Sequence, residues 1–151
     1  MPTSHPDSVM NLMVLIDADF LLQKVHSLRQ VQQGHLTWNE FGEKIARSVP
    51  GNYRRYHDHD PERAPAPGPT VWLSAKELVH AAMISQDLKY EQVRKRLIYF
   101  ERPSTPSLFT TLSLWLAGKL GISVTTTQPM VAAMLYGVGQ SDGNWGILVD
   151  C

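Results

Sequence analysis

The sequence is poor in cysteine and has no excess of charge of either sign. Cys151 is the only cysteine in 151 residues, which excludes an internal disulfide and a metal site made of paired cysteines. Fourteen Lys and Arg residues balance fourteen Asp and Glu residues, so the formal net charge is zero. This balance argues against a strongly basic nucleic-acid-binding protein and against a polyacidic one.

Long hydrophobic runs are absent as well. The apolar run at 12–16 ends at Asp17, and the longest run elsewhere covers only 130–136. A secretory signal needs roughly 7–15 apolar residues, and a membrane-spanning helix needs roughly 20. We therefore expect a cytoplasmic protein without membrane contact. Residues 1–11 are polar and indicate a disordered leader, with Met1, Met10 and Met13 as alternative starts.

The rest of the chain has the composition of a folded protein. Hydrophobic residues make up 43% and charged residues 19%, and the length suits one domain, which we place at 12–151. Proline recurs five times within 50–70, too often for a helix or a strand, so we predict a long loop that can engage a protein partner. The composition does not predict the oligomeric state.

Segments typical of strands and of helices alternate along the chain. The strand predictions are 12–16, 70–73, 96–101, 122–127 and 145–149. The helix predictions are 18–32, a helix after a capping box at 37–40, another after a capping box at 74–77, a helix at 108–120 stopped by Gly121, and a helix begun by Pro129. This alternation predicts an α/β fold with a mainly parallel sheet and helices on both faces.

Acidic residues directly follow three of the predicted strands. They are Asp17, Glu101 and Asp150, and Asp19 lies two residues beyond Asp17. Because the carboxyl ends of parallel strands line one crevice, these carboxylates are expected to converge there on Mg²⁺ or Mn²⁺. Such an ion can activate water and stabilise a phosphoryl transition state. The ordinary alternative is that Asp17 or Asp19 caps the following helix.

Basic residues gather in two other segments. Arg54 and Arg55 stand between Tyr53 and Tyr56, a combination that suits single-stranded nucleic acid. The candidates for phosphate contact in the second segment are Lys95, Arg96 and Arg102. The adjoining segment 57–60, His-Asp-His-Asp, offers two histidine ligands to a metal or is simply a polar loop.

The segment Val14-Leu-Ile-Asp-Ala-Asp-Phe-Leu-Leu22 resembles the opening of PIN-like ribonucleases, especially the NYN branch. Residues 95–104, followed by the helix at 109–120 and the segment 121–124, are similar to a later part of NYN domains. The resemblance implies a Rossmann-like three-layer α/β/α sandwich and a metal-dependent endoribonuclease with Asp17 as a metal ligand. The family's late acidic motif has no counterpart except Asp150, which favours an RNA-binding or regulatory relative.

Two other functions fit the same residues. Asp17-Ala-Asp19 also resembles the first motif of haloacid-dehalogenase-type phosphatases, in which the first Asp attacks phosphate and the second acts as acid and base; Thr125 or Thr126 would supply the second motif. The non-enzymatic alternative is a regulatory or protein-interaction α/β module that binds its partner through the loop at 50–70.

Overall fold

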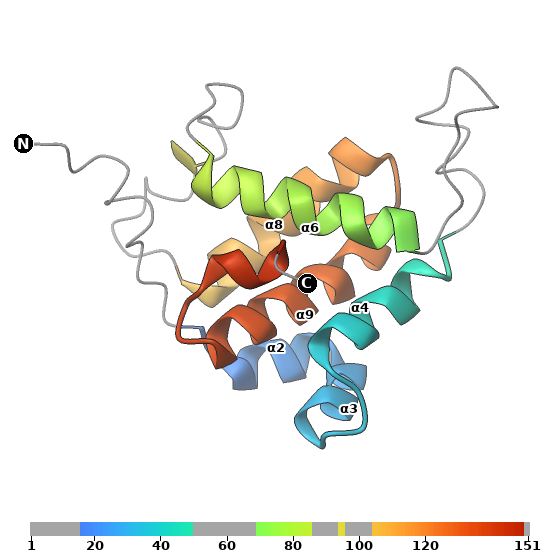
Figure 1. Ribbon diagram of the computed structural model, residues 1–151, viewed down its shortest axis with the longest axis vertical. Helices are drawn as coiled ribbons and strands as arrows, with labels where there is room; N and C mark the ends of the chain where they lie inside the picture. Colours follow the sequence, from blue (N-terminus) through green and yellow to red (C-terminus); the bar gives the residue numbers. More distant parts are fainter. Residues whose placement is uncertain (1–15, 50–68, 86–93, 96–103, 150–151) are drawn as a thin grey trace, which may run out of the picture.

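The computed structural model describes residues 16–49, 69–85, 94–95 and 104–149, and every regular element in these ranges is helical (Figure 1). The elements, in chain order, are α2 (Ala18–Lys24), the 3-10 helix η1 (His26–Leu28), α3 (Arg29–Gln32), α4 (Trp38–Ala46), α6 (Pro69–Ile84), α8 (Thr105–Leu120), α9 (Val124–Gln140) and the 3-10 helix η3 (Trp145–Leu148). None of the helices in these ranges is long and apolar enough to cross a membrane.

The prediction of an α/β fold, a Rossmann-like three-layer sandwich with a mainly parallel sheet, is wrong for this part of the chain. Residues 70–73 lie in the first turns of α6, residues 124–127 form the first turn of α9, and residues 145–148 form η3. Short apolar or β-branched runs suit a buried helix as well as a strand, and here the packing decides. The predicted strands at 12–16 and 96–101 lie outside the described residues, apart from Ile16, which is not in a strand.

Helix α9 lies at the centre of the molecule and contacts α2, α4, α6, α8 and η3 (Figure 1). Every residue from Met130 to Val138 is buried. The helix begins at Val124, capped by the hydroxyl of Ser123, so the prediction that Pro129 opens it is wrong. Within the core, the Thr127 hydroxyl donates to the carbonyl oxygen of Ser113 at 2.8 Å and joins α9 to α8.

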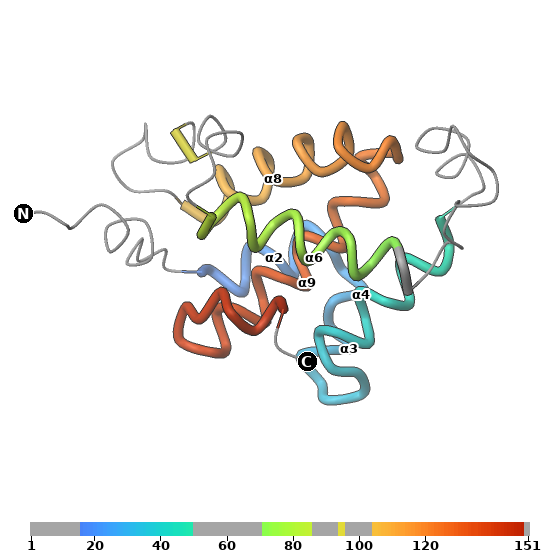
Figure 2. The backbone as a smooth tube through the Cα atoms, turned by 45° about the horizontal axis from the view of Figure 1, so that its top comes forward, coloured from blue at the N-terminus to red at the C-terminus, as the bar shows by residue number. Residues whose placement is uncertain are grey.

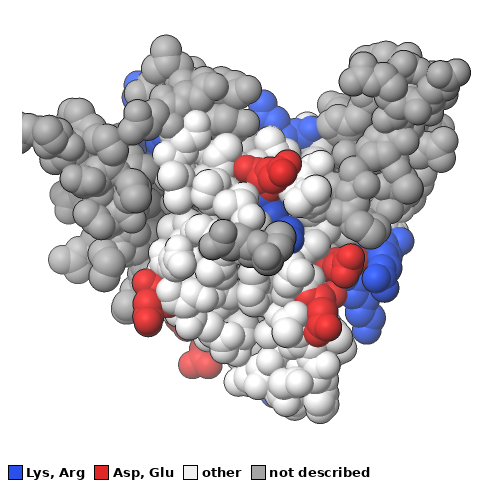
Figure 3. Space-filling model, in the orientation of Figure 1, with Lys and Arg blue, Asp and Glu red and all other residues white. Residues whose placement is uncertain are grey.

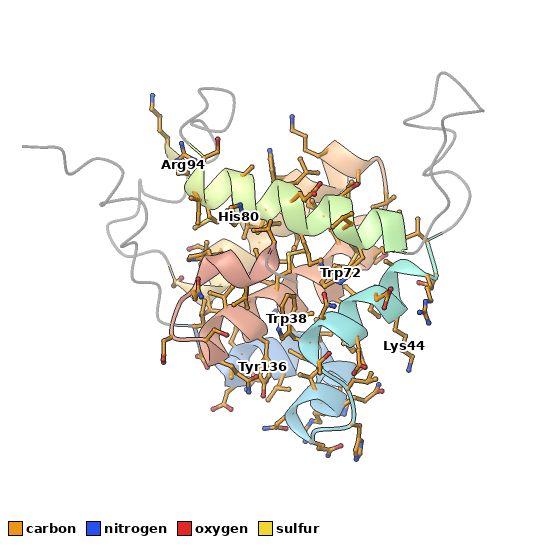
Figure 4. All side chains as sticks on the ribbon, viewed as in Figure 1. Trp38, Lys44, Trp72, His80, Arg94 and Tyr136 are labelled. Atoms are coloured by element: carbon orange, nitrogen blue, oxygen red, sulfur yellow. The ribbon has the colours of Figure 1, made fainter. Side chains whose placement is uncertain are left out.

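Two tryptophans fix the position of α4 against α6 and α9. The ring of Trp72 on α6 lies directly over Gly42 of α4, and the ring of Trp38 on α4 lies over Gly137 of α9. A β-carbon at residue 137 would come within 2.7 Å of the Trp38 ring, so the close approach of these helices requires glycine. The two indoles meet edge to face with their centroids 6.1 Å apart (Figure 4).

Two of the helix ends predicted from the sequence are confirmed, and one is wrong. The capping box at 37–40 is confirmed: the Thr37 hydroxyl accepts from the Glu40 amide at 3.0 Å, and the Glu40 carboxylate accepts from the Thr37 amide at 2.9 Å. Gly121 ends α8 in the left-handed region at φ 68°, also as predicted. The capping box predicted at 74–77 is wrong, because Ser74 and Glu77 lie inside α6 and not at its start.

The helix predicted at 18–32 is divided into three pieces. Val25, at φ −127° and ψ 87°, separates α2 from η1, and α3 follows η1 directly. The break lets Leu21, Leu22, Val25, Leu28 and Val31 all reach the core. Helix α8 runs along one edge of the molecule (Figure 2), and it contacts α2, where the rings of Phe20 and Phe109 meet edge to face with their centroids 5.9 Å apart.

Candidate interaction surface

Asp17, the central residue of the predicted metal site, caps helix α2. Its carboxylate accepts a hydrogen bond from the amide of Phe20 at 3.2 Å, and its own amide donates to the hydroxyl of Thr105 at 2.7 Å. The ordinary alternative, a helix cap, is therefore confirmed for Asp17. Asp19 is exposed in the first turn of α2, where its negative charge suits the positive end of the helix dipole.

The other acidic candidates, Glu101 and Asp150, lie outside the described residues. Within the described ranges, no three His, Cys, Asp or Glu side chains come close enough together to hold a metal ion. The structure therefore does not bring Asp17 and Asp19 together with a third ligand in the part of the chain that it describes. Binding of Mg²⁺ or Mn²⁺ stays a prediction from the sequence.

Most basic candidates also lie outside the described residues. These are Arg54, Arg55, Arg96 and Arg102, together with the segment 57–60 and the predicted loop up to residue 68. Residues 69 and 70, which we assigned to that loop, belong to α6. Lys95 lies within the described residues and is exposed, so its side chain can contact phosphate. None of the other predicted phosphate-binding residues lies within the described ranges to form a site with it.

Arg94, next to Lys95, has a structural role. Its side chain is only 6% exposed, and one guanidinium nitrogen donates to the carbonyl oxygens of Ala82 at 3.0 Å and Ala81 at 3.4 Å (Figure 4). These carbonyls belong to the last turn of α6, where carbonyl groups lack donors from a further helical turn; that of Ala81 also accepts from the Ser85 amide at 2.8 Å. A cation at this end also complements the helix dipole. Arg94 is thus the C-terminal cap of α6.

A second buried cation, Lys76, joins α6 to α4. Lys76 is 6% exposed, and its ammonium group donates to the side-chain oxygen of Asn39 at 2.8 Å and lies 5.3 Å from the centre of the Trp72 ring. The same Asn39 oxygen accepts from the indole nitrogen of Trp72 at 2.7 Å. Sequence reasoning missed this group, because the spacing between Asn39 and Lys76 carries no motif. Its geometry indicates a structural link between the two helices.

The outward side of α8 differs from these sites because no side-chain contact joins it to another described helix; Ser107 alone on it is bonded to a neighbour, the N-cap Ser104. We define the α8 face as Ser107, Thr110, Thr111, Leu114 and Gly118, which lie on one side of the helix. Leu114 is 59% exposed, the largest exposed fraction of any large hydrophobic residue in the described part of the chain. Thr110 and Gly118, one turn before and after it, are exposed too.

The α8 face carries no charge, and the chain around it carries almost none. From Ser104 to Val149 the only charged residues are Lys119 and Asp142. The side of the molecule with α6 and η3 in front does show Asp, Glu, Lys and Arg side chains among its described residues, with both signs present (Figure 3). This gap in charge is visible in the sequence and could have pointed to the α8 face, but only once α8 was known to lie at the surface.

Comparison of the chain with models of known protein families, with curated proteins and with solved structures finds no match. The resemblance to PIN-like ribonucleases stays a prediction, since these comparisons do not bear on it. Any function assigned to the described residues must therefore be argued from their exposure, contacts and charge.

Proposed function

We propose that this chain is a protein-interaction module that binds its partner through the α8 face. The observation that carries the proposal is Leu114, which is 59% exposed at the middle of a helix face without charge. Exposed apolar side chains that stand alone are common on protein surfaces. Leu114 differs because its neighbours on the face are neutral hydroxyl residues and glycine, none of which needs to keep contact with water.

The α8 face shares one property with the centre of a protein interface, the absence of charged residues. Interface centres are depleted of charge, and a few residues carry most of the binding energy. Thr110 and Thr111 can keep their hydroxyl groups bonded to helix carbonyls when water is excluded. Half-buried Trp115 borders the face and adds apolar surface to it.

The enzymatic alternatives lack such support. Both the ribonuclease and the phosphatase hypotheses placed Asp17 and Asp19 at the end of a strand in a parallel sheet, and no strand exists in the described ranges. Asp17 instead holds the start of α2. RNA cleavage and phosphatase activity stay untested predictions from the sequence, and the contacts of the described residues favour the interaction module.

A photo-activatable amino acid placed at residue 114 tests the proposal, with residue 73 as the matched control. Leu73 on α6 is 47% exposed and lies outside the α8 face. We expect a specific crosslinked product from residue 114 in the cells that make this protein, and little from residue 73. Equal yields at both positions would overturn the proposal.

Binding measurements complete the test, with the partner that the crosslink identifies purified in its free form. Leu114→Glu should weaken its affinity at least about tenfold, since loss of a central apolar contact costs more than about 1 kcal/mol. Leu73→Glu should leave the affinity unchanged. A partner that binds Leu114→Glu as tightly as the wild type would contradict the assignment of the α8 face.

A further inference from the structure

We infer that Asp142 and Gly143 form a modification site, at which Asp142 turns into isoaspartate through a cyclic succinimide, at a rate set by the opening of the C-terminal end of α9. The site lies in the turn between α9 and η3 and is independent of the α8 face. The order of the two residues, their exposure and the backbone hydrogen bonds of the turn support it.

The sequence supplies both reacting groups in adjacent residues. Asp142 is followed by Gly143, and no other Asp or Asn in the 151 residues precedes a glycine. The amide nitrogen of residue 143 can attack the side-chain carbonyl carbon of Asp142, because both atoms belong to one short segment of chain and close a five-membered ring. Glycine carries no side chain that would hinder this approach.

The reaction balances without a cofactor. A nitrogen–carbon bond forms, the carbon–oxygen bond of the protonated carboxyl group breaks, and the amide proton leaves with that hydroxyl group as water. Water then opens the ring at either of its carbonyl carbons. Opening at the former side-chain carbonyl restores aspartate, whereas opening at the former main-chain carbonyl leaves isoaspartate, with Gly143 attached through the side chain of residue 142.

The turn leaves the reacting groups open to water. Asp142 and Gly143 are both exposed, and a β-carbon at residue 143 would meet nothing within 4 Å. No hydrogen bond or ion pair to the rest of the described chain holds the Asp142 carboxylate. It can therefore rotate toward the next amide, unlike the Asp17 carboxylate, which accepts from the amide of Phe20.

A backbone hydrogen bond restrains the attacking nitrogen. The Gly143 amide donates to the carbonyl oxygen of Val138 at 2.9 Å, the bond that closes the C-terminal end of many helices. While this bond is intact, the amide proton stays on the nitrogen and the nitrogen stays directed at the helix. Ring formation therefore requires the last turn of α9 to open, as the exchange of that amide hydrogen with water does.

The same turn has two features that favour opening. The residue before the bonded amide is usually glycine in such a cap, because its φ is positive. Here it is Asp142, at φ 57°, the only described residue other than glycine in the left-handed region. The following position often carries an apolar side chain that packs back on the helix, and Gly143 has none. We therefore expect this turn to open more readily than the interior of α9.

Conversion changes the connection between α9 and η3. Isoaspartate adds one carbon to the main chain, so the bond to the Val138 carbonyl oxygen loses its geometry. The next residue, Asn144, begins η3 by accepting from the Gly146 amide at 2.9 Å, and η3 buries Trp145 and Leu148. Because η3 contacts both α6 and α9, we expect conversion to loosen η3 from the core.

Peptide mapping of the aged full chain tests the site. The protein is incubated at neutral pH in water enriched in heavy oxygen, and fragmentation mass spectrometry distinguishes isoaspartate from aspartate at each position. We expect isoaspartate and heavy oxygen at residue 142, and neither at Asp17 or Asp19. Asp142→Glu should lose the product, since glutamate does not close a five-membered ring, and Asp142→Asn should restore it with release of ammonia.

A peptide with the sequence of residues 138–146 measures the rate without the helix cap. We expect the folded chain to convert more slowly than this peptide, by the factor with which the fold protects the Gly143 amide from hydrogen exchange. Unfolding the chain in urea should bring its rate to that of the peptide.

Either of two results overturns the inference: a folded chain that converts at residue 142 no faster than at Asp19, or one that converts as fast as the peptide although the Gly143 amide is protected from exchange. Hydrogen exchange of the converted chain tests the structural consequence. Loss of protection in η3 with α4 unchanged would confirm that conversion loosens η3, and unchanged protection in both would contradict it.

Discussion

At the scale of single residues, the side-chain oxygen of Asn39 joins two donors of α6. It accepts hydrogen bonds from both Lys76 and Trp72, which are buried, while Asn39 itself is exposed. Burial of an ammonium group is costly unless its donors are satisfied. Asn39 therefore supplies an acceptor for a buried cation between α4 and α6.

Substitution of Asn39 tests this dependence. Asn39→Ala should lower the free energy of unfolding by about 1–3 kcal/mol, because it removes the acceptor shared by the Lys76 ammonium and the Trp72 indole N–H. Lys76→Met should change it by less than about 1 kcal/mol, since it removes the charge and keeps most of the packing over Trp72. Urea denaturation measures both. If Lys76→Met cost as much as Asn39→Ala, attraction between the ammonium and the Trp72 ring would be the larger contribution.

Asp17 makes a second prediction at this scale. Asn is as good a helix cap as Asp, so Asp17→Asn should leave the free energy of unfolding within about 0.5 kcal/mol, whereas Asp17→Ala should lose about 1 kcal/mol. Thermal unfolding with and without Mg²⁺ or Mn²⁺ tests the cation expectation on the same proteins. Stabilisation of the wild type by the ion that disappears in Asp17→Asn would show that Asp17 binds metal besides capping α2.

At the scale of secondary structure, Arg94 shows how a residue distant in sequence completes a helix. It supplies the donor for the last carbonyls of α6 from outside that helix. Arg94→Met should therefore lower the free energy of unfolding by about 1–3 kcal/mol, as expected for a lost hydrogen bond from a charged group. The neighbouring, exposed Lys95→Met is the matched control and should have no measurable effect. Equal stabilities of the two variants in urea denaturation would contradict the capping role.

The elements that the sequence predicted correctly have local signals at their ends. The capping box of Thr37 and Glu40 begins α4, and Gly121 ends α8; both use contacts within a few residues, which a sequence pattern can record. The elements predicted wrongly, the first turns of α6 and α9 and the helix η3, are runs of Val, Thr, Trp and Leu. Their helical state depends on burial against distant helices, which no local pattern contains.

At the scale of the whole molecule, the arrangement of charge explains why the candidate site changed. The sequence placed acids at the ends of three strands; the strand predicted before Asp150 is the helix η3 at 145–148, and the strands predicted before Asp17 and Glu101 lie outside the described residues apart from Ile16. The face that replaced it is defined by an absence of charge on α8. The charge gap after Ser104 could be read from the sequence; the exposure of Leu114 could not, since it depends on which side of α8 packs against α9.

The central position of α9 has a consequence for how the chain acquires its structure during synthesis. Helices α2 and α4 leave the ribosome early, yet the residues that bury them, Met130 to Val138, are made near the end of the described chain. The early helices therefore have no core to fold onto until α9 emerges. Although every described element is helical, the contacts that join α4 to α9 span most of the chain, and such distant contacts slow folding. Until synthesis passes α9, α2 and α4 lack the surface that buries them in the folded chain.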